Sequence, residues 1–155
     1  MGLLDFLFPK APKVPLDVIR AADLGEPWAE MQLSKAFDKG LTADEHNALR
    51  RMAYSFEASQ GDPVAQYWMG FLSWMNDKNV ERAIYWFELA AKQGNTEAMR
   101  NLAHGYGEFL NTANLDYGPP PFGLDEKRAY YWLKKAADLG DEKAIESFRV
   151  FYGEG

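Results

Sequence analysis

Small apolar residues recur along the chain at a helical period, and glycines punctuate them. An alanine-containing run ends at a glycine in four places, Gly25, Gly61, Gly94 and Gly140. An alanine lies three residues before each glycine, another lies four residues after it, and a large apolar residue lies eight residues after it. Because glycine adopts a left-handed conformation cheaply, each glycine predicts a helix end. No segment alternates apolar and polar residues as a strand would, so the pattern predicts only helices.

Capping residues set the predicted starts of these helices. Asp62, Asn95 and Asp141 directly follow glycines and can accept hydrogen bonds from the first helical amides. Pro27 and Pro63 suit a first helical turn. Each unit therefore has a first helix, expected at 27–39, 63–75, 96–109 and 142–152. A second helix follows, expected at 43–60, 80–93 and 126–139, and a partial helix at 17–24 opens the stack.

These helices group into about three and a half helix–turn–helix repeats in an all-α fold. We expect one repeat domain over 17–155. Its units are expected at about 26–61, 62–94 and 95–140, and a C-terminal capping helix at 141–155. An apolar, proline-rich N-terminal tail over 1–16 precedes the domain.

Several positions match a known repeat family. The matching residues of one unit are Ala98, Leu102, Ala103, Tyr106, Arg128, Ala129, Trp132, Lys135, Ala136, Ala137 and Gly140. Over about 17–155 the chain resembles the Sel-one-like repeat (SLR), a relative of the tetratricopeptide repeat (TPR). The Leu-Gly pair of that family is replaced by Leu33-Ser34, Met69-Gly70 and Leu102-Ala103, and Ala53 stands where the first unit should have a Trp. The resemblance implies a right-handed α/α solenoid, an adaptor or scaffold role, and first helices that line a concave face.

The net charge and the absence of cysteine limit the class of partner and the compartment that we expect. The 155-residue chain carries a formal net charge of −6 at pH 7. An acidic protein repels phosphate backbones, so we expect no nucleic acid and favour a basic protein or peptide as partner. The chain has no cysteine, which excludes disulfides and cysteine-ligated metals and fits a reducing compartment such as the cytoplasm. The oligomeric state is left open.

The N-terminal tail has two interpretations. Its apolar residues are Leu3, Leu4, Phe6, Leu7 and Phe8. We favour a role in capping the end of the solenoid. The alternative is a segment that docks on a membrane surface or a partner. The run is short and holds Asp5, so stable membrane insertion is not expected.

An insertion over 111–124 interrupts the third unit. Gly118 and Pro119–Pro121 are incompatible with a helix there. Long loops are often functional, so Tyr117 and Phe122 are candidate partner contacts. Local packing of both rings under the loop is an equal alternative.

No pattern in the chain indicates catalysis. The only histidines are His46, which we expect to be solvated, and His104, which has no carboxylate one turn away. Acidic doublets lie at predicted helix starts, where negative charge favours the helix dipole. Trp86 and Trp132 occupy equivalent repeat positions and are predicted to lie in the core. We therefore expect no enzyme activity, no metal and no cofactor.

The candidate binding residues lie on first helices, away from the packed alanine stripe. In the second unit these positions are too apolar for a solvated face. With the neighbouring units and the insertion, the candidates are Trp28, Met31, Val64, Tyr67, Phe71, Trp74, Met75, Arg100, His104, Tyr117 and Phe122. Aromatic anchors beside a polar rim are typical of binding hot spots. The alternative is that these side chains are buried against the next repeat.

The expected function is therefore a non-catalytic interaction module that binds a partner protein through the concave face. A narrower alternative is an immunity or inhibitor protein that neutralises a toxin or enzyme by direct binding. Its motivation is the small size and acidic charge. A hydrolase is the least favoured option, because no nucleophile–base arrangement is visible.

Overall fold

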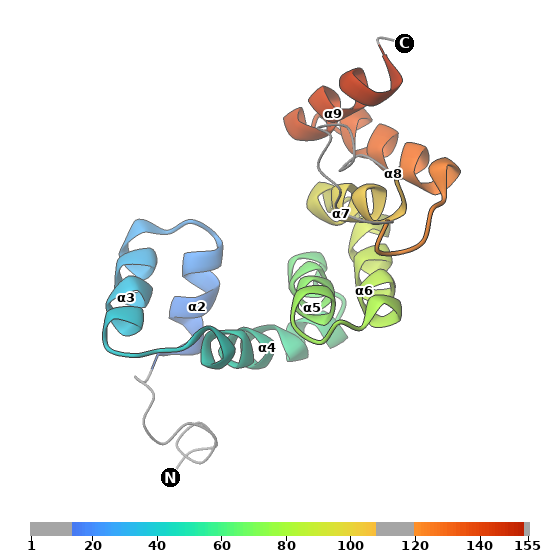
Figure 1. Cartoon of the computed structure of the whole chain (residues 1–155). Coiled ribbons are helices and arrows are strands. Elements are labelled where there is room, and N and C mark those ends of the chain that lie inside the picture. Colours follow the sequence, from blue (N-terminus) through green and yellow to red (C-terminus); the bar gives the residue numbers. More distant parts are fainter. Residues whose placement is uncertain (1–13, 108–119, 154–155) are drawn as a thin grey trace. The chain divides into compact units, whose positions relative to one another are not determined.

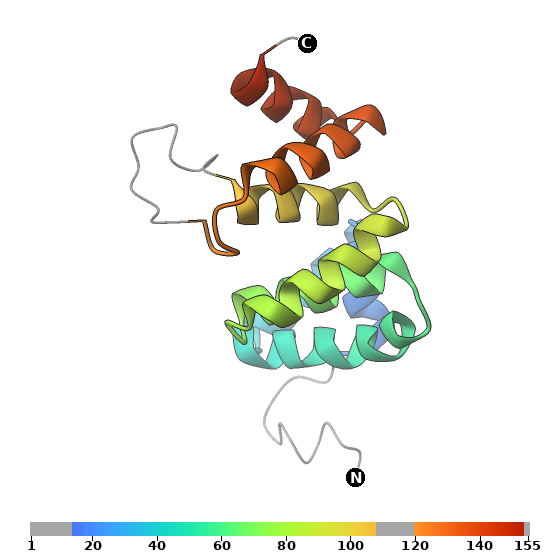
Figure 2. The same cartoon turned by 90° about the vertical axis from the view of Figure 1, so that its right-hand side faces the viewer.

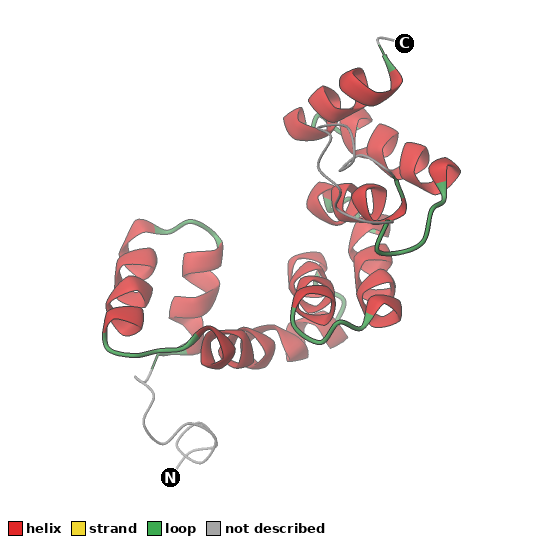
Figure 3. Cartoon of the chain, in the orientation of Figure 1, coloured by secondary structure: helices red, strands yellow, loops and turns green. Residues whose placement is uncertain are grey.

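A computed structural model describes residues 14–107 and 120–153 of the chain. Within these ranges the regular structure consists of eight α-helices and no strand (Figure 3). The all-α prediction is confirmed. The chain divides into two compact units, Met1–Phe56 and Glu57–Gly155, and each is described by itself. The assignment of 17–155 to one domain stays a prediction.

The first unit contains α2 (Leu16–Asp23), α3 (Pro27–Asp38) and most of α4 (Ala43–Ser59). α2 packs against α3. Ile19, Ala29 and Ala53 are completely buried, one from each helix. A capping box starts α4, because the Thr42 amide donates to Glu45 Oε2 at 2.8 Å and the Glu45 amide donates to Thr42 Oγ1 at 3.2 Å.

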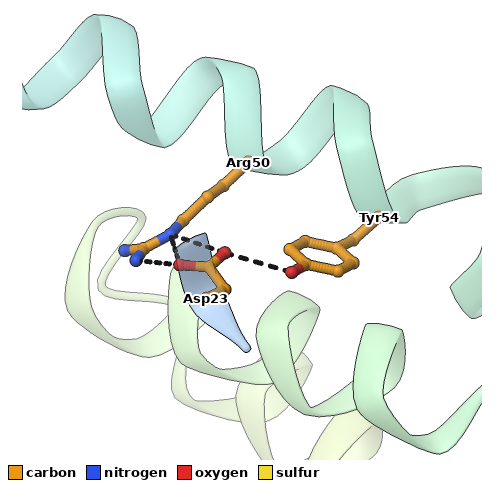
Figure 4. A network of polar contacts seen from close by, with 3 residues as sticks. All are labelled: Asp23, Arg50 and Tyr54. Carbon is orange, nitrogen blue, oxygen red and sulfur yellow. Dashed lines mark hydrogen bonds and ion pairs between the residues drawn. The ribbon is translucent and has the colours of Figure 1, made fainter. Parts of the chain in front are cut away.

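A buried polar network joins α2 to α4 (Figure 4). The Arg50 guanidinium forms an ion pair with Asp23, whose side chain is almost completely buried. Tyr54 donates its hydroxyl to Asp23 Oδ2 at 3.1 Å, and burial together with the Asp23 charge raises the pKa of Tyr54. Arg20 donates through Nε to the Ala53 carbonyl at 2.9 Å. A buried carboxylate is costly unless it is paired, so these contacts fix α2 on α4.

The second unit contains α5 (Pro63–Met75), α6 (Val80–Lys92), α7 (Thr96–Tyr106), α8 (Glu126–Asp138) and α9 (Glu142–Tyr152). Each of these helices packs against the next one in the chain (Figures 1 and 2). Phe87, Met99, Leu102 and Leu133 are completely buried in one core. This succession is the predicted helical-repeat solenoid. Its handedness stays a prediction.

The turns follow the sequence pattern closely. The four predicted glycines have φ angles between +80° and +97°. After three of them, Asp62, Asn95 and Asp141 accept hydrogen bonds from the alanine amides three residues later, at 2.7 to 2.9 Å. Helix starts agree with the predicted positions to within one residue. α7 ends at Tyr106, because the next residue, Gly107, has an extended backbone.

The two tryptophans predicted for the core differ in burial. Trp132 is buried among the core residues of α8. Trp86 is only partly buried, although its ring nitrogen is buried and has no hydrogen-bond partner among the described residues. None of the described helices combines the length and the apolar character that crossing a bilayer requires.

Candidate functional site

The candidate site is centred on α5, a helix without a charged side chain. Its start is set by Asp62, which caps the Ala65 amide, and by Pro63 in the first turn. The side-chain amides of buried Gln66 and exposed Gln93 hold this end of the helix. Gln93 Nε2 donates to Gln66 Oε1 at 2.8 Å and to the Gly61 carbonyl at 2.9 Å. α5 is therefore anchored without any ion pair of its own.

One side of α5 is fully committed to the core. Ala65, Met69 and Leu72 are buried on this side. Gly70 brings α5 close to α6, because a Cβ atom added there would lie 2.7 Å from Cδ1 of Phe87. This close contact identifies the side of α5 that faces the core, and the other side of the helix faces away from it.

The opposite side of α5 carries an apolar stripe. Its members are Val64, Tyr67, Phe71, Trp74 and Met75, and we call them the α5 stripe. Val64 is 39% exposed and Met75 is 47% exposed, whereas the three rings are partly buried. The rings of Tyr67 and Phe71 lie 6.3 Å apart. The rings therefore pack on the edge of the core and still reach the surface.

Trp68 joins the same surface and was missed in the sequence. It is partly buried, and its ring meets the ring of Phe71 edge to face at 5.7 Å. Trp68 lies one turn after Val64, so the helical period places it on the outward side. This spacing from Val64 could have identified Trp68 from the sequence.

Phe122, from the end of the insertion, is partly buried beside the α5 stripe. Its ring centre lies 5.0 Å from that of Trp74 and 5.7 Å from that of Tyr106. The Phe122 amide donates to the Gly105 carbonyl at 2.8 Å, and a Cβ atom at Gly105 would lie 2.0 Å from the Phe122 ring. The Phe122 ring therefore packs within this unit, and its contact with a partner stays a prediction. Tyr117 lies outside the described residues.

The outward side of α7 is polar. Arg100 Nε lies 3.1 Å from Asp141 Oδ1, and the Arg100 side chain is largely buried. Burial lowers the pKa of His104, and the Arg100 charge lowers it further. His104 is therefore neutral at pH 7 and can donate or accept a hydrogen bond. The two residues make the outward side of α7 polar, and their role as a border to the apolar α5 stays a prediction.

Trp28 and Met31, the remaining candidates, belong to the first unit. Both are about half exposed on α3, one turn apart. They form a small apolar patch on that helix. Their continuity with the α5 stripe stays a prediction.

One expectation about candidate chemistry was wrong. His46 is only 8% exposed, and the edge of its ring meets the Phe37 ring with the centres 5.3 Å apart. Its Nε2 atom is buried and has no hydrogen-bond partner within the described part of the chain, and burial lowers the pKa of His46. The charged neighbours along the chain suggested solvent, but His46 shares the inward side of α4 with Leu49 and Ala53. Across residues 14–107 and 120–153, no three His, Asp or Glu side chains gather as metal ligands would.

In the second unit, pairs of helices end at glycine turns and stack around an alanine-rich core. This arrangement defines the class of helical-repeat proteins. The family model of the Sel1 repeat matches residues 63–95 and 96–141, about half of the chain. The chain therefore belongs to the Sel1 repeat family, as its resemblance to the Sel-one-like repeat predicted. No curated protein and no solved structure matches it. Sel1 repeats are generally protein-interaction modules and are typically non-catalytic.

Proposed function

We propose that this protein is an adaptor that holds a segment of a partner protein on the outward sides of α5 and α7. The observation that supports it best is the α5 stripe. A surface helix normally carries charged residues on its solvated side, whereas α5 has none. Half-exposed Val64 and Met75 flank the partly exposed rings of Tyr67 and Phe71. Contiguous apolar surface of this kind is typical of an interaction site.

The side-chain types fit a protein partner. Aromatic residues and methionine are enriched in the centres of protein interfaces. Rings that are already packed lose little conformational entropy when a partner covers them, which favours affinity. Tyr67 contacts Phe71 and Phe87 at 6.3 and 6.0 Å between ring centres, so it is held in place before any partner arrives.

The polar border on α7 would orient the partner. Asp141 holds the Arg100 guanidinium, and Glu97 lies 3.8 Å from it, so its charge is largely compensated. The neutral His104 offers directional hydrogen bonding. In this proposal the rim selects an orientation, while α5 supplies most of the affinity.

The net charge of −6 would act at longer range. It would accelerate encounter with a basic partner and suppress acidic ones, and this effect would weaken with salt. The absence of cysteine is compatible with a reducing compartment, and we expect the adaptor to work in the cytoplasm. In this proposal the protein has no enzyme activity of its own.

The double substitution Val64→Ser and Met75→Ser tests the proposal. Both side chains are well exposed, so the variant should fold as the unmodified chain does. Tyr85→Ser is the matched control, because Tyr85 is an even more exposed large side chain on the neighbouring α6.

Partners are captured from a lysate of the native cells on immobilised chain and identified by mass spectrometry. A partner that uses the α5 stripe is retained by the unmodified chain and the control, and weakened at least about tenfold by the double variant. If every reproducible partner is retained equally by the double variant, α5 is not the binding face.

A further inference from the structure

A second candidate surface, partly apolar and partly charged, lies at the far end of the second unit. A pocket of about 530 Å³ opens between α8 and α9. Tyr130, Lys134 and Ala137 line it from α8, and Ile145, Phe148 and Arg149 line it from α9. We call it the terminal groove. Its volume is within the range of sites that take up ligands or partner side chains.

The internal repeat shows what covers this surface one unit earlier. Counted from the glycines, Ile145 and Phe148 of α9 correspond to Met99 and Leu102 of α7. Met99 and Leu102 are completely buried, whereas Ile145 is 37% exposed and Phe148 is only partly buried. The terminal groove is therefore the equivalent repeat surface, and no described residue covers it as α8 covers Met99 and Leu102.

The cover of the earlier surface is α8. This helix packs against α7, and its buried residues share one core with Met99 and Leu102. The buried residues are Ala129, Trp132, Leu133 and Ala136. Their spacing makes one contact stripe on the helix, in the order small, aromatic, aliphatic, small. A helix with the same stripe fits the corresponding surface of α9.

The charges at the two surfaces are reversed. α6 carries Glu88, paired with Lys92 at 3.7 Å, and α8 has Lys134 in the corresponding place, paired with Asp138 at 2.7 Å. In the earlier unit, the covering helix places Arg128 within the field of Glu88. The pKa of Arg128 is raised chiefly by its hydrogen bond to Tyr106 and also by the charges of Asp125 and Glu88. A helix on the terminal groove would meet Lys134 instead.

We propose that the terminal groove binds an amphipathic helix of a partner protein. This helix repeats the contact stripe of α8 and carries an acidic residue where α8 has Arg128. The proposal involves the α8–α9 surface alone, so its failure would leave the function proposed for α5 and α7 untouched.

Two synthetic peptides with the sequence of residues 125–139 serve as probes. One has the natural sequence, and the other carries Arg128→Glu. Both are stapled into helices on the side opposite the stripe, so that weak binding cannot come from an unfolded peptide. Fluorescence anisotropy with the full chain should show saturable binding of both, with Kd values below about 1 mM. The acidic peptide should bind about two- to five-fold more tightly, the usual range for one exposed charge pair.

Substitutions in the full chain locate the peptide. Ile145→Asp places a charge on the floor of the terminal groove and should abolish binding. Val150→Asp is the matched control, because Val150 lies on the same helix, is 66% exposed and does not line the groove. Lys134→Glu should reverse the preference, so that the natural peptide binds more tightly than the acidic one. Circular dichroism checks that each variant is folded.

Three results would overturn the proposal. The first is the absence of saturable binding. The second is binding that Ile145→Asp does not change, since the peptide would then be replacing the chain's own α8. The third is a concentration-dependent dimer of the unmodified chain that Ile145→Asp dissociates, since a second copy would then occupy the groove.

Discussion

α5 and α7 hold the same position in consecutive repeats, yet only their inward sides are alike. Four residues after its glycine each helix buries an alanine, Ala65 or Ala98, and eight residues after it each buries a larger apolar side chain, Met69 or Leu102. The outward positions differ completely. Val64, Tyr67 and Phe71 of α5 correspond to Glu97, Arg100 and His104 of α7.

This comparison distinguishes the residues that build the solenoid from the residues that a partner can contact. Inward positions must match from unit to unit, because each helix packs in the same way on the next one. Outward positions are less constrained, although Tyr67 and Phe71 still pack against the edge of the core. In our proposal, the apolar outward side of α5 and the polar outward side of α7 reflect the surface that a partner contacts.

The largest expected effect tests the inward similarity. Met69→Ala and Leu102→Ala remove equivalent buried side chains, and each should lower the free energy of unfolding by about 2–5 kcal/mol. The outward substitutions Val64→Ser and Glu97→Ser should each change the free energy of unfolding by about 0.5 kcal/mol or less. Urea unfolding followed by circular dichroism measures all four. An outward substitution as costly as its inward counterpart would contradict the division between the two sides.

A smaller effect concerns the glycines inside the two helices. Gly70→Ala and Gly105→Ala each push a Cβ atom into a phenylalanine ring, Phe87 or Phe122, and each should cost about 1–3 kcal/mol. The rings differ, because Phe87 is completely buried whereas Phe122 is partly buried in a loop.

A second substitution distinguishes the two glycines. Phe122→Ala should remove most of the cost of Gly105→Ala, since the added methyl group then has space. The double-mutant cycle measures this coupling from denaturant midpoints. Additive losses at Gly105 and Phe122 would show that the ring does not rest on this glycine in solution.

The helices, turns and repeat stack were predictable from sequence because glycines and capping residues act locally. Gly61, for example, ends one helix through its left-handed backbone, and the Asp62 side chain starts the next helix by capping the Ala65 amide. The burial of His46 was not predicted, because it depends on which side of α4 meets the core. The position of Phe122 depends on the close approach of its ring to Gly105, a contact between distant parts of a repeat. The terminal groove becomes visible only when burial is compared between units.

The smallest effect concerns pH. The pKa of His104 is lowered in the folded chain, so below its usual value of 6.5 the unfolded chain binds the proton more readily. The contribution of His104 to stability is therefore complete above pH 6.5 and falls as the pH drops below it. His104→Phe, which copies the α5 residue, should flatten the dependence of stability on pH between about pH 7 and pH 5. Thermal melts at steps of half a pH unit measure the slope. The pKa of His46 is also lowered, so His46 accounts for the dependence of stability on pH that remains in the variant.

Site-specific photo-crosslinking tests the role of the α5 stripe most directly. A photoreactive residue replaces Met75 on α5 in one version of the chain and Tyr85 on α6 in another, and both are expressed in the native cells. Both side chains are well exposed, so neither replacement should disturb folding. The account predicts a discrete crosslinked partner protein from position 75 and none from position 85. The same partner from both positions, or none from position 75, would contradict it.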